Sequence, residues 1–150
     1  MKISFRGDYA LKAILDLALH YDQGLVKIQD IAGRQDIPLK YLEQILLSLK
    51  GAGYVNSQRG AKGGYYLAKE PKKIKIGEII RFMEGPVSPI TCVSKSCHKK
   101  CSEEAHCVFR PIWDKVRIMT EGIVDKTSFA DLCKKHEEKS RSQELKMYYI

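Results

Sequence analysis

The chain has 150 residues, of which 26 are basic and 18 acidic, so its formal net charge is +8. This length fits one domain with a short appendage and excludes a large two-domain enzyme with a deep cleft. Hydrophobic residues make up 44% of the chain and charged residues 29%, which excludes wholesale disorder. No apolar run approaches the ~20 residues of a membrane span. Charged residues also interrupt the N-terminal stretch where a signal peptide would lie, so we expect a cytoplasmic protein.

The positive charge is concentrated in the first half of the chain. Residues 1–75 hold 13 basic and 7 acidic side chains, whereas residues 76–150 hold 13 basic and 11 acidic. A basic half indicates an anionic partner such as nucleic acid or a lipid surface. Charge by itself leaves open a protein that has a high pI and no such partner.

Three helices are predicted before the middle of the chain. Residues 7–21 and 38–50 both place apolar side chains at helical spacing, and a short helix over residues 28–35 lies between them. Pro38 suits the first position of the third helix. Asp36 stands in the turn before it, where a left-handed backbone is needed that Asp tolerates less well than Gly.

A glycine-rich hairpin and a fourth helix follow. One strand is predicted to begin at Tyr54 and another to cover residues 65–67, and the glycines between them allow a tight turn. Residues 76–84 form the fourth helix. Glycine and prolines then break regular structure.

The last third begins with a long helix that carries a narrow apolar seam. Its apolar residues are spaced 3, 4, 3 and 4 apart, as in paired helices, at Phe109, Ile112, Val116, Met119 and Ile123. Ser128, with Asp131 three residues later, predicts a capping box that starts a last short helix. The chain beyond Lys134 is polar and is expected to fray.

This order of elements is that of a winged helix-turn-helix. The predicted fold is mainly α with a small β-hairpin wing and a long dimerisation helix. The winged helix-turn-helix is expected at residues 1–84 and a cysteine-rich loop at residues 85–108. The dimerisation helix with the last short helix follows at residues 109–133, and a polar tail at residues 134–150. A three-helix bundle without a DNA function is the alternative that the local pattern leaves open.

The third helix and the hairpin carry side chains that suit double-stranded DNA. Glu can accept a hydrogen bond from cytosine N4, and Gln can pair with adenine. A basic residue at a hairpin tip can enter a minor groove or hold a phosphate. The candidate contacts are Lys40, Tyr41, Glu43, Gln44, Arg59, Gly60 and Lys62. Each of them could instead be a solvated surface residue, but together they predict a reading surface.

Four of the five cysteines lie close together, at positions 92, 97, 101 and 107. In a cytosolic chain such clustering is typical of a metal or redox site rather than of disulfides. The spacing has no CxxC knuckle of the zinc type, and thiolates on a loose loop suit an iron–sulfur cluster. Zinc and metal-free redox thiols remain alternatives. Cys133, which stands apart, is predicted to be a small buried hydrophobe.

Several segments together resemble the IscR/NsrR/CymR superfamily of bacterial winged-helix regulators, most of all its IscR-like members. They are FRGDYALKAILDLA from residue 5, LKYLEQIL from residue 39, RGAKGGYYLA from residue 59 and CVFRPIWDKV from residue 107. The resemblance covers roughly residues 1–133. It implies a homodimer paired through the helix after the cysteine loop. It also implies that Glu43, Gln44 and Arg59 lie at base or groove contacts.

The resemblance further implies three cysteine ligands to an iron–sulfur cluster, matched here by Cys92, Cys101 and Cys107. The histidine that IscR uses as its fourth ligand corresponds to Arg110, so that ligand set cannot be copied. IscR-like resemblance favours a 2Fe–2S over a 4Fe–4S centre.

The fourth ligand is therefore open. NsrR-like members use an aspartate from the first helix of the partner subunit, and Asp8 matches that position. We rank Asp8 first and Cys97 second, with His98 and His106 as further local competitors.

The sequence thus predicts a homodimeric transcriptional regulator that binds a palindromic operator and is controlled by an iron–sulfur cluster. The IscR-like resemblance implies that it regulates cluster-biogenesis genes. The alternatives are an NsrR-like repressor that senses nitric oxide or redox state, and a CymR-like repressor controlled by thiols or a partner without a cluster. No catalytic constellation is present, so we expect no enzyme, no small-molecule substrate and no membrane partner.

Overall fold

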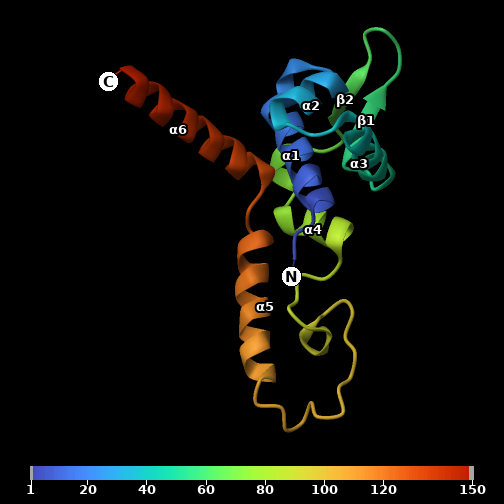
Figure 1. Cartoon of the computed structure of the whole chain (residues 1–150), viewed down its shortest axis with the longest axis vertical. Coiled ribbons are helices and arrows are strands. Elements are labelled where there is room, and N and C mark those ends of the chain that lie inside the picture. The colour runs from blue at the N-terminus through green and yellow to red at the C-terminus, as the bar shows by residue number, and fades with distance from the viewer. Residues whose placement is uncertain (1, 149–150) are drawn as a thin grey trace.

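The computed structural model describes residues 2–148, which form six α-helices and a two-stranded antiparallel sheet (Figure 1). The helices and strands are, in chain order, α1 (Phe5–Leu19), α2 (Ile28–Gln35), α3 (Leu39–Gly51), β1 (Val55–Gln58), β2 (Gly64–Leu67), α4 (Ile76–Glu84), α5 (Arg110–Val124) and α6 (Phe129–Tyr148). The predicted mainly α fold with a small β-hairpin wing is confirmed. No helix in the described range is long and apolar enough to cross a membrane.

The joint between α2 and α3 has the geometry of a helix-turn-helix. Asp36 ends α2 with φ 51° and ψ 50°, the left-handed conformation that the turn needs. Asp can adopt it because its short side chain is able to hydrogen-bond locally. Ile31, Ile37 and Leu42 are buried in the core at this joint. Pro38 lies one residue before α3 rather than inside its first turn.

An ion pair between a buried carboxylate and a partly exposed guanidinium, which the sequence pattern did not reveal, ties α1 to α2. The Asp16 side chain is 1% exposed. It accepts hydrogen bonds from Arg34 Nε at 2.9 Å, from Arg34 Nη2 at 2.8 Å and from Gln35 Nε2 at 3.1 Å. The hydrogen bond with Asp16 raises the pKa of the Arg34 guanidinium. A carboxylate removed from water needs such partners, so the pair fixes how α2 packs on α1.

The wing is a β-hairpin in which Val55 pairs with Leu67 and Gln58 with Gly64. Val26, just before α2, forms an isolated antiparallel bridge with β2 through two backbone hydrogen bonds with Tyr65 of 2.9 and 2.8 Å. This close approach requires Gly64, because a Cβ there would lie 2.7 Å from the Val26 carbonyl oxygen. The wing is therefore anchored to the start of the helix-turn-helix.

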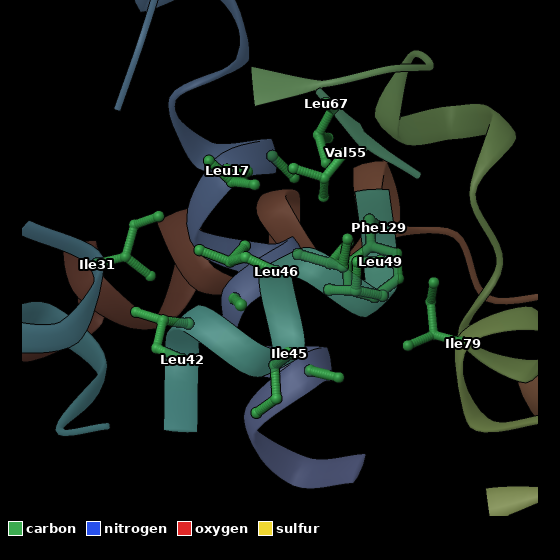
Figure 2. Packing of buried hydrophobic residues seen from close by; sticks show 14 of the residues in the cluster. Leu17, Ile31, Leu42, Ile45, Leu46, Leu49, Val55, Leu67, Ile79 and Phe129 are labelled. Atoms are coloured by element: carbon green, nitrogen blue, oxygen red, sulfur yellow. The ribbon is translucent and has the colours of Figure 1, made fainter. Parts of the chain in front are cut away.

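The core draws apolar side chains from nearly every element (Figure 2). Leu46 and Leu49 of α3 lie at its centre, with Leu17 of α1 on one side. Phe129, the first residue of α6, is fully buried against this core although it is far from it in sequence. The predicted capping box holds it there: Asp131 accepts from the Ser128 backbone N–H at 2.9 Å, and Ser128 Oγ accepts from the Asp131 N–H at 3.2 Å.

The last helix is longer than predicted. We expected a short helix from Ser128 and a frayed polar tail from residue 134, but α6 continues to Tyr148 and projects away from the body of the molecule (Figure 1). The prediction was wrong because it followed the loss of apolar periodicity. This segment consists largely of strong helix formers such as Lys, Glu and Arg, and it contains neither Gly nor Pro. Residues 149 and 150 of the predicted tail lie outside the described part of the chain.

Candidate DNA-binding surface and cysteine loop

Helix α3 presents two different faces. Its apolar side chains Leu42, Ile45, Leu46 and Leu49 are buried in the core. The side chains between them are exposed, among them the predicted contacts Lys40, Tyr41, Glu43 and Gln44. This division follows directly from the 3.6-residue helical period. An exposed helix face that follows a helix-turn-helix joint is the element that such folds insert into the major groove.

A groove runs between this face and the wing. Its lining brings together the predicted residues Glu43, Gln44 and Arg59, together with Leu47, Lys50, Ser57, Gln58, Gly64 and Tyr65. Lys50 Nζ donates a hydrogen bond of 2.7 Å to Ser57 Oγ, which links the end of α3 to β1. The recognition helix and the wing are thus held as one surface with base-reading and cationic groups side by side.

The remaining predicted contacts lie around this groove. Lys40 and Tyr41 are exposed at the start of α3, and Lys62 is exposed in the wing. Gly60, which has φ +113°, lines a second hollow between the wing and the first residues of α2, together with Lys27 and Gln29. Gly suits this position because other residues rarely adopt positive φ.

Three basic residues of this surface were not predicted. Lys50 lies seven residues after Glu43, two turns along the same face, so helical spacing could have identified it. Lys27 is brought to the wing by the pairing of Val26 with Tyr65. Arg6 of α1 donates from Nη2 to Ser48 Oγ at 3.2 Å, beside the recognition helix. Only the tertiary fold brings these last two to α3 and the wing, where both add positive charge beside the candidate contacts.

The cysteine loop, residues 85–108, lies beside α5 at the end of the molecule away from the wing (Figure 1). Cys92 is half-buried in a short 3-10 turn, Thr91–Val93, that packs on α5. Cys107 is also half-buried, whereas Cys97 and Cys101 are exposed, and all are free thiols. Hence the loop presents its thiols on a surface rather than inside a core.

These thiols do not form a metal site within one chain. Across residues 2–148, no three Cys, His, Asp or Glu side chains gather into a group that could hold a metal ion. Asp8, the predicted fourth ligand, instead forms an ion pair of 2.7 Å with Lys12 of its own helix, and this hydrogen bond raises the pKa of Lys12. The donor chemistry of the four loop cysteines suits an iron–sulfur cluster, although they do not form such a group among the described residues.

Ion pairs organise the second half of the loop. Glu104 Oε1 lies 3.3 Å from His98 Nε2 and 3.0 Å from Arg110 Nη2. Desolvation opposes ionisation of Glu104, but His98 and Arg110 outweigh it and hold the pKa of the carboxyl below its usual value. Cys101 and Cys107, which flank Glu104, are therefore tethered to the first residue of α5.

Helix α5 presents its apolar seam to solvent. Phe109, just before it, and Ile112, Val116, Met119 and Ile123 are all exposed. A second face, which carries Arg117 and Val124, is buried against the rest of the chain. An amphipathic helix that faces its apolar side outward lacks the partner surface that such a side normally covers.

The comparisons with known proteins bear on both surfaces. A family model described as Rrf2, "Iron-dependent Transcriptional regulator", matches residues 3–135. The chain belongs to the Rrf2 family. It is 35% identical over 150 residues to the HTH-type transcriptional regulator CymR of Bacillus subtilis, and the match covers 100% of both chains.

Solved structures of Rrf2 proteins have the same fold. The structure of CymR, described as the global cysteine regulator of B. subtilis, matches 89% of this chain and 97% of its own with a TM-score of 0.78 at 35% identity. IscR of T. potens matches 92% of this chain and 90% of its own with a TM-score of 0.73 at 40% identity. The predicted winged helix-turn-helix regulator, and the prediction that it is not an enzyme, are thereby confirmed. Relatives named IscR and CymR are similarly close, so the kind of control is not decided by likeness.

Proposed function

We propose that this Rrf2 protein is a homodimeric, operator-binding regulator whose DNA affinity is set by an iron–sulfur cluster on the cysteine loop. Its role in the cytoplasm would be the IscR-like control of cluster-biogenesis genes. The observation that carries the DNA-binding part is the groove that brings Glu43 and Gln44 of α3 to Arg59 of the wing. A winged helix needs this pairing of a base-reading helix with a groove-gripping hairpin.

Each predicted contact has a distinct role on DNA. Glu43 and Gln44 read base edges in the major groove, and Lys40 and Tyr41 hold phosphates beside it. The wing residues, Arg59, Gly60 and Lys62, grip the adjacent groove. A two-fold dimer places its half-sites about 34–36 Å apart, or a multiple of that distance, so the operator is palindromic.

The exposed seam of α5 supports the homodimer. A second copy of the same helix covers it, because identical seams are self-complementary about a two-fold axis. Replacement of Met119 with Asp should convert the dimer to monomers, measured by light scattering after gel filtration. Ile118→Asp is the matched control, since Ile118 is also exposed but lies off the seam. An unchanged Met119→Asp dimer would contradict this interface.

The cysteine loop supports the cluster proposal through its donor set. Cys92, Cys101 and Cys107 would be the ligands of the chain itself, with Asp8 of a second chain as the fourth ligand and Cys97 as the substitute. Iron–sulfur clusters favour thiolate ligands, and a 2Fe–2S centre is the form we propose. Binding would require the loop to bring together thiols that do not form a metal-binding group among the described residues.

The test is anaerobic purification with quantification of iron and acid-labile sulfide. Two of each per chain, lost in Cys101→Ser but kept in Cys133→Ser, would support the proposal. Four of each would instead indicate a 4Fe–4S centre of the NsrR-like kind. Neither iron nor sulfide after anaerobic reconstitution would overturn the cluster and leave the DNA-binding surface in place.

A CymR-like thiol switch is the second candidate. Free, exposed Cys97 and Cys101 favour it, as does the match to CymR along the whole chain. In this case metal-free protein would change its DNA affinity on oxidation, and Cys97→Ser would abolish that change. A metal-free protein whose affinity is the same before and after oxidation would exclude the switch.

A further inference from the structure

One carboxylate joins the cysteine loop, α5 and α4. Glu121 of α5 has an 18% exposed side chain, and its oxygens lie 2.7 Å from Arg117 Nη1, 3.4 Å from Lys95 Nζ and 4.0 Å from Arg81 Nη2. Lys95 belongs to the cysteine loop, three residues after Cys92, and Arg81 belongs to α4. Three cations from three elements therefore converge on Glu121.

Further ion pairs and a close contact join α4 and α5 at this junction. Arg81 forms a bidentate pair with Asp125 at 2.6 and 2.8 Å, and this hydrogen bonding lowers the pKa of Asp125. Arg117, whose side chain is 8% exposed, also donates to Asp114 at 2.6 Å. Gly77 of α4 lies so close that a Cβ there would be 3.0 Å from a methyl group of Val124. Planar guanidinium groups favour one bidentate geometry with a carboxylate, so these pairs favour the present position of α4 against α5.

The junction continues towards the DNA-binding surface. Helix α4 packs on α1, and α1 packs on the recognition helix α3. Glu84, the last residue of α4, accepts hydrogen bonds from the Ser4 N–H at 3.1 Å and the Ser4 hydroxyl at 2.5 Å, at the start of α1. A shift of α4 would therefore be passed to α1, which contacts α3.

We infer that Glu121 is the positioning residue that couples the cysteine loop to the recognition helix, with Lys95 as its sensor contact. Lys95 is 73% exposed and is held by Glu121 alone among the ion pairs of the described residues. A loop rearranged by a ligand or by oxidation would withdraw Lys95 from Glu121. The Glu121 carboxylate would then interact only with Arg117 and Arg81, and the contact between α5 and α4 would change. This coupling rests on the proposed control of DNA binding by the loop.

The test compares Glu121→Gln and Lys95→Met with a matched control, Glu103→Gln, which removes an exposed loop carboxylate that takes part in no ion pair among the described residues. The first readout is amide hydrogen exchange in the reduced, cluster-free dimer. We expect both variants to accelerate exchange in residues 76–84 and 91–95 by about two- to five-fold, the range of a partly exposed ion pair, and the control to leave it unchanged. Unchanged exchange in both variants would overturn the junction.

The second readout is operator affinity in reduced, diamide-oxidised and iron–sulfide-reconstituted protein. In the wild type, the ratio of operator affinities between the reduced state and each of the other two states measures how strongly the loop controls DNA binding. Glu121→Gln should reduce this ratio by at least about two-fold. Adding Lys95→Met to Glu121→Gln should not reduce it further. An undiminished ratio in Glu121→Gln would refute the inference and leave the proposed function intact. A wild-type ratio of one, together with the expected exchange effects, would refute loop control and leave the mechanical junction standing.

Discussion

Removal of the Arg34 guanidinium should destabilise the protein, because it leaves the buried Asp16 carboxylate without its main partner. Arg34→Met keeps most of the aliphatic volume but leaves the Asp16 carboxylate, 1% exposed, with Gln35 as its remaining side-chain amide donor. Breaking a fully buried pair costs about 3–5 kcal/mol. Arg34 itself is 40% exposed, so water can partly replace it. We therefore expect a loss of about 2–3 kcal/mol in the free energy of unfolding.

The assay is urea unfolding followed by circular dichroism at one fixed protein concentration, because the stability of the proposed dimer would depend on concentration. The midpoint should fall while the dependence on urea stays constant. Arg59→Met is the matched control, since it removes the same group from the exposed wing, and it should change stability by less than about 0.5 kcal/mol. A loss below about 1 kcal/mol in Arg34→Met would refute the view that this pair clamps α2 to α1.

Three further predictions concern DNA reading, the wing and the α4–α5 joint. Glu43→Ala should change which base is preferred, whereas Lys40→Ala should weaken binding to all sequences alike and lower the salt dependence of binding by about one phosphate contact. Binding to operator variants at several salt concentrations separates the two effects. A uniform loss of affinity across sequences in Glu43→Ala would contradict its role in base reading. Gly64→Ala should destabilise the fold by about 1–3 kcal/mol, because its Cβ would press on the Val26 carbonyl. Gly51→Ala, which has open space around it, should be neutral or stabilising in the same urea assay. Equal effects of the two substitutions would count against the pairing of Val26 with the wing. Arg81 lowers the pKa of Asp125, so this pair stabilises the fold above about pH 4, and its stabilisation is lost as the pH falls through the folded-state pKa. The difference in free energy of unfolding between wild type and Asp125→Asn should therefore shrink on acidification. A difference that stays constant with pH would exclude a stabilising role for the pair.

Most of the candidate DNA-binding surface could be predicted from the sequence. Apolar periodicity placed α1 to α5 within a few residues, and the alternation along α3 identified Glu43 and Gln44 as exposed. The wing glycines and the Ser128 capping box are local signals in the same sense. The length of α6 was missed because helix propensity without an apolar stripe was given too little weight.

The cysteine loop shows where such prediction stops. The clustering of four cysteines indicated a metal or redox site, and the family resemblance selected Cys92, Cys101 and Cys107 as ligands. Among the described residues, however, no three potential ligands lie close enough together to hold a metal ion. Asp8, the predicted fourth ligand, lies in an exposed ion pair with Lys12 of its own helix, and its role as a ligand stays a prediction. Ligand spacing limits which residues can meet, but the fold of the loop and the approach of a second chain decide whether they do.

What the sequence determined by itself is therefore the set of elements and their exposed faces, because helical and strand periods act within one segment. The tertiary structure decided which distant groups meet: Arg34 with Asp16, Lys27 with the wing, and Lys95 and Arg81 with Glu121. These contacts join side chains from different elements, and no periodicity spans them. They form because packing of the common core brings the elements to fixed distances, at which opposite charges removed from water must be paired.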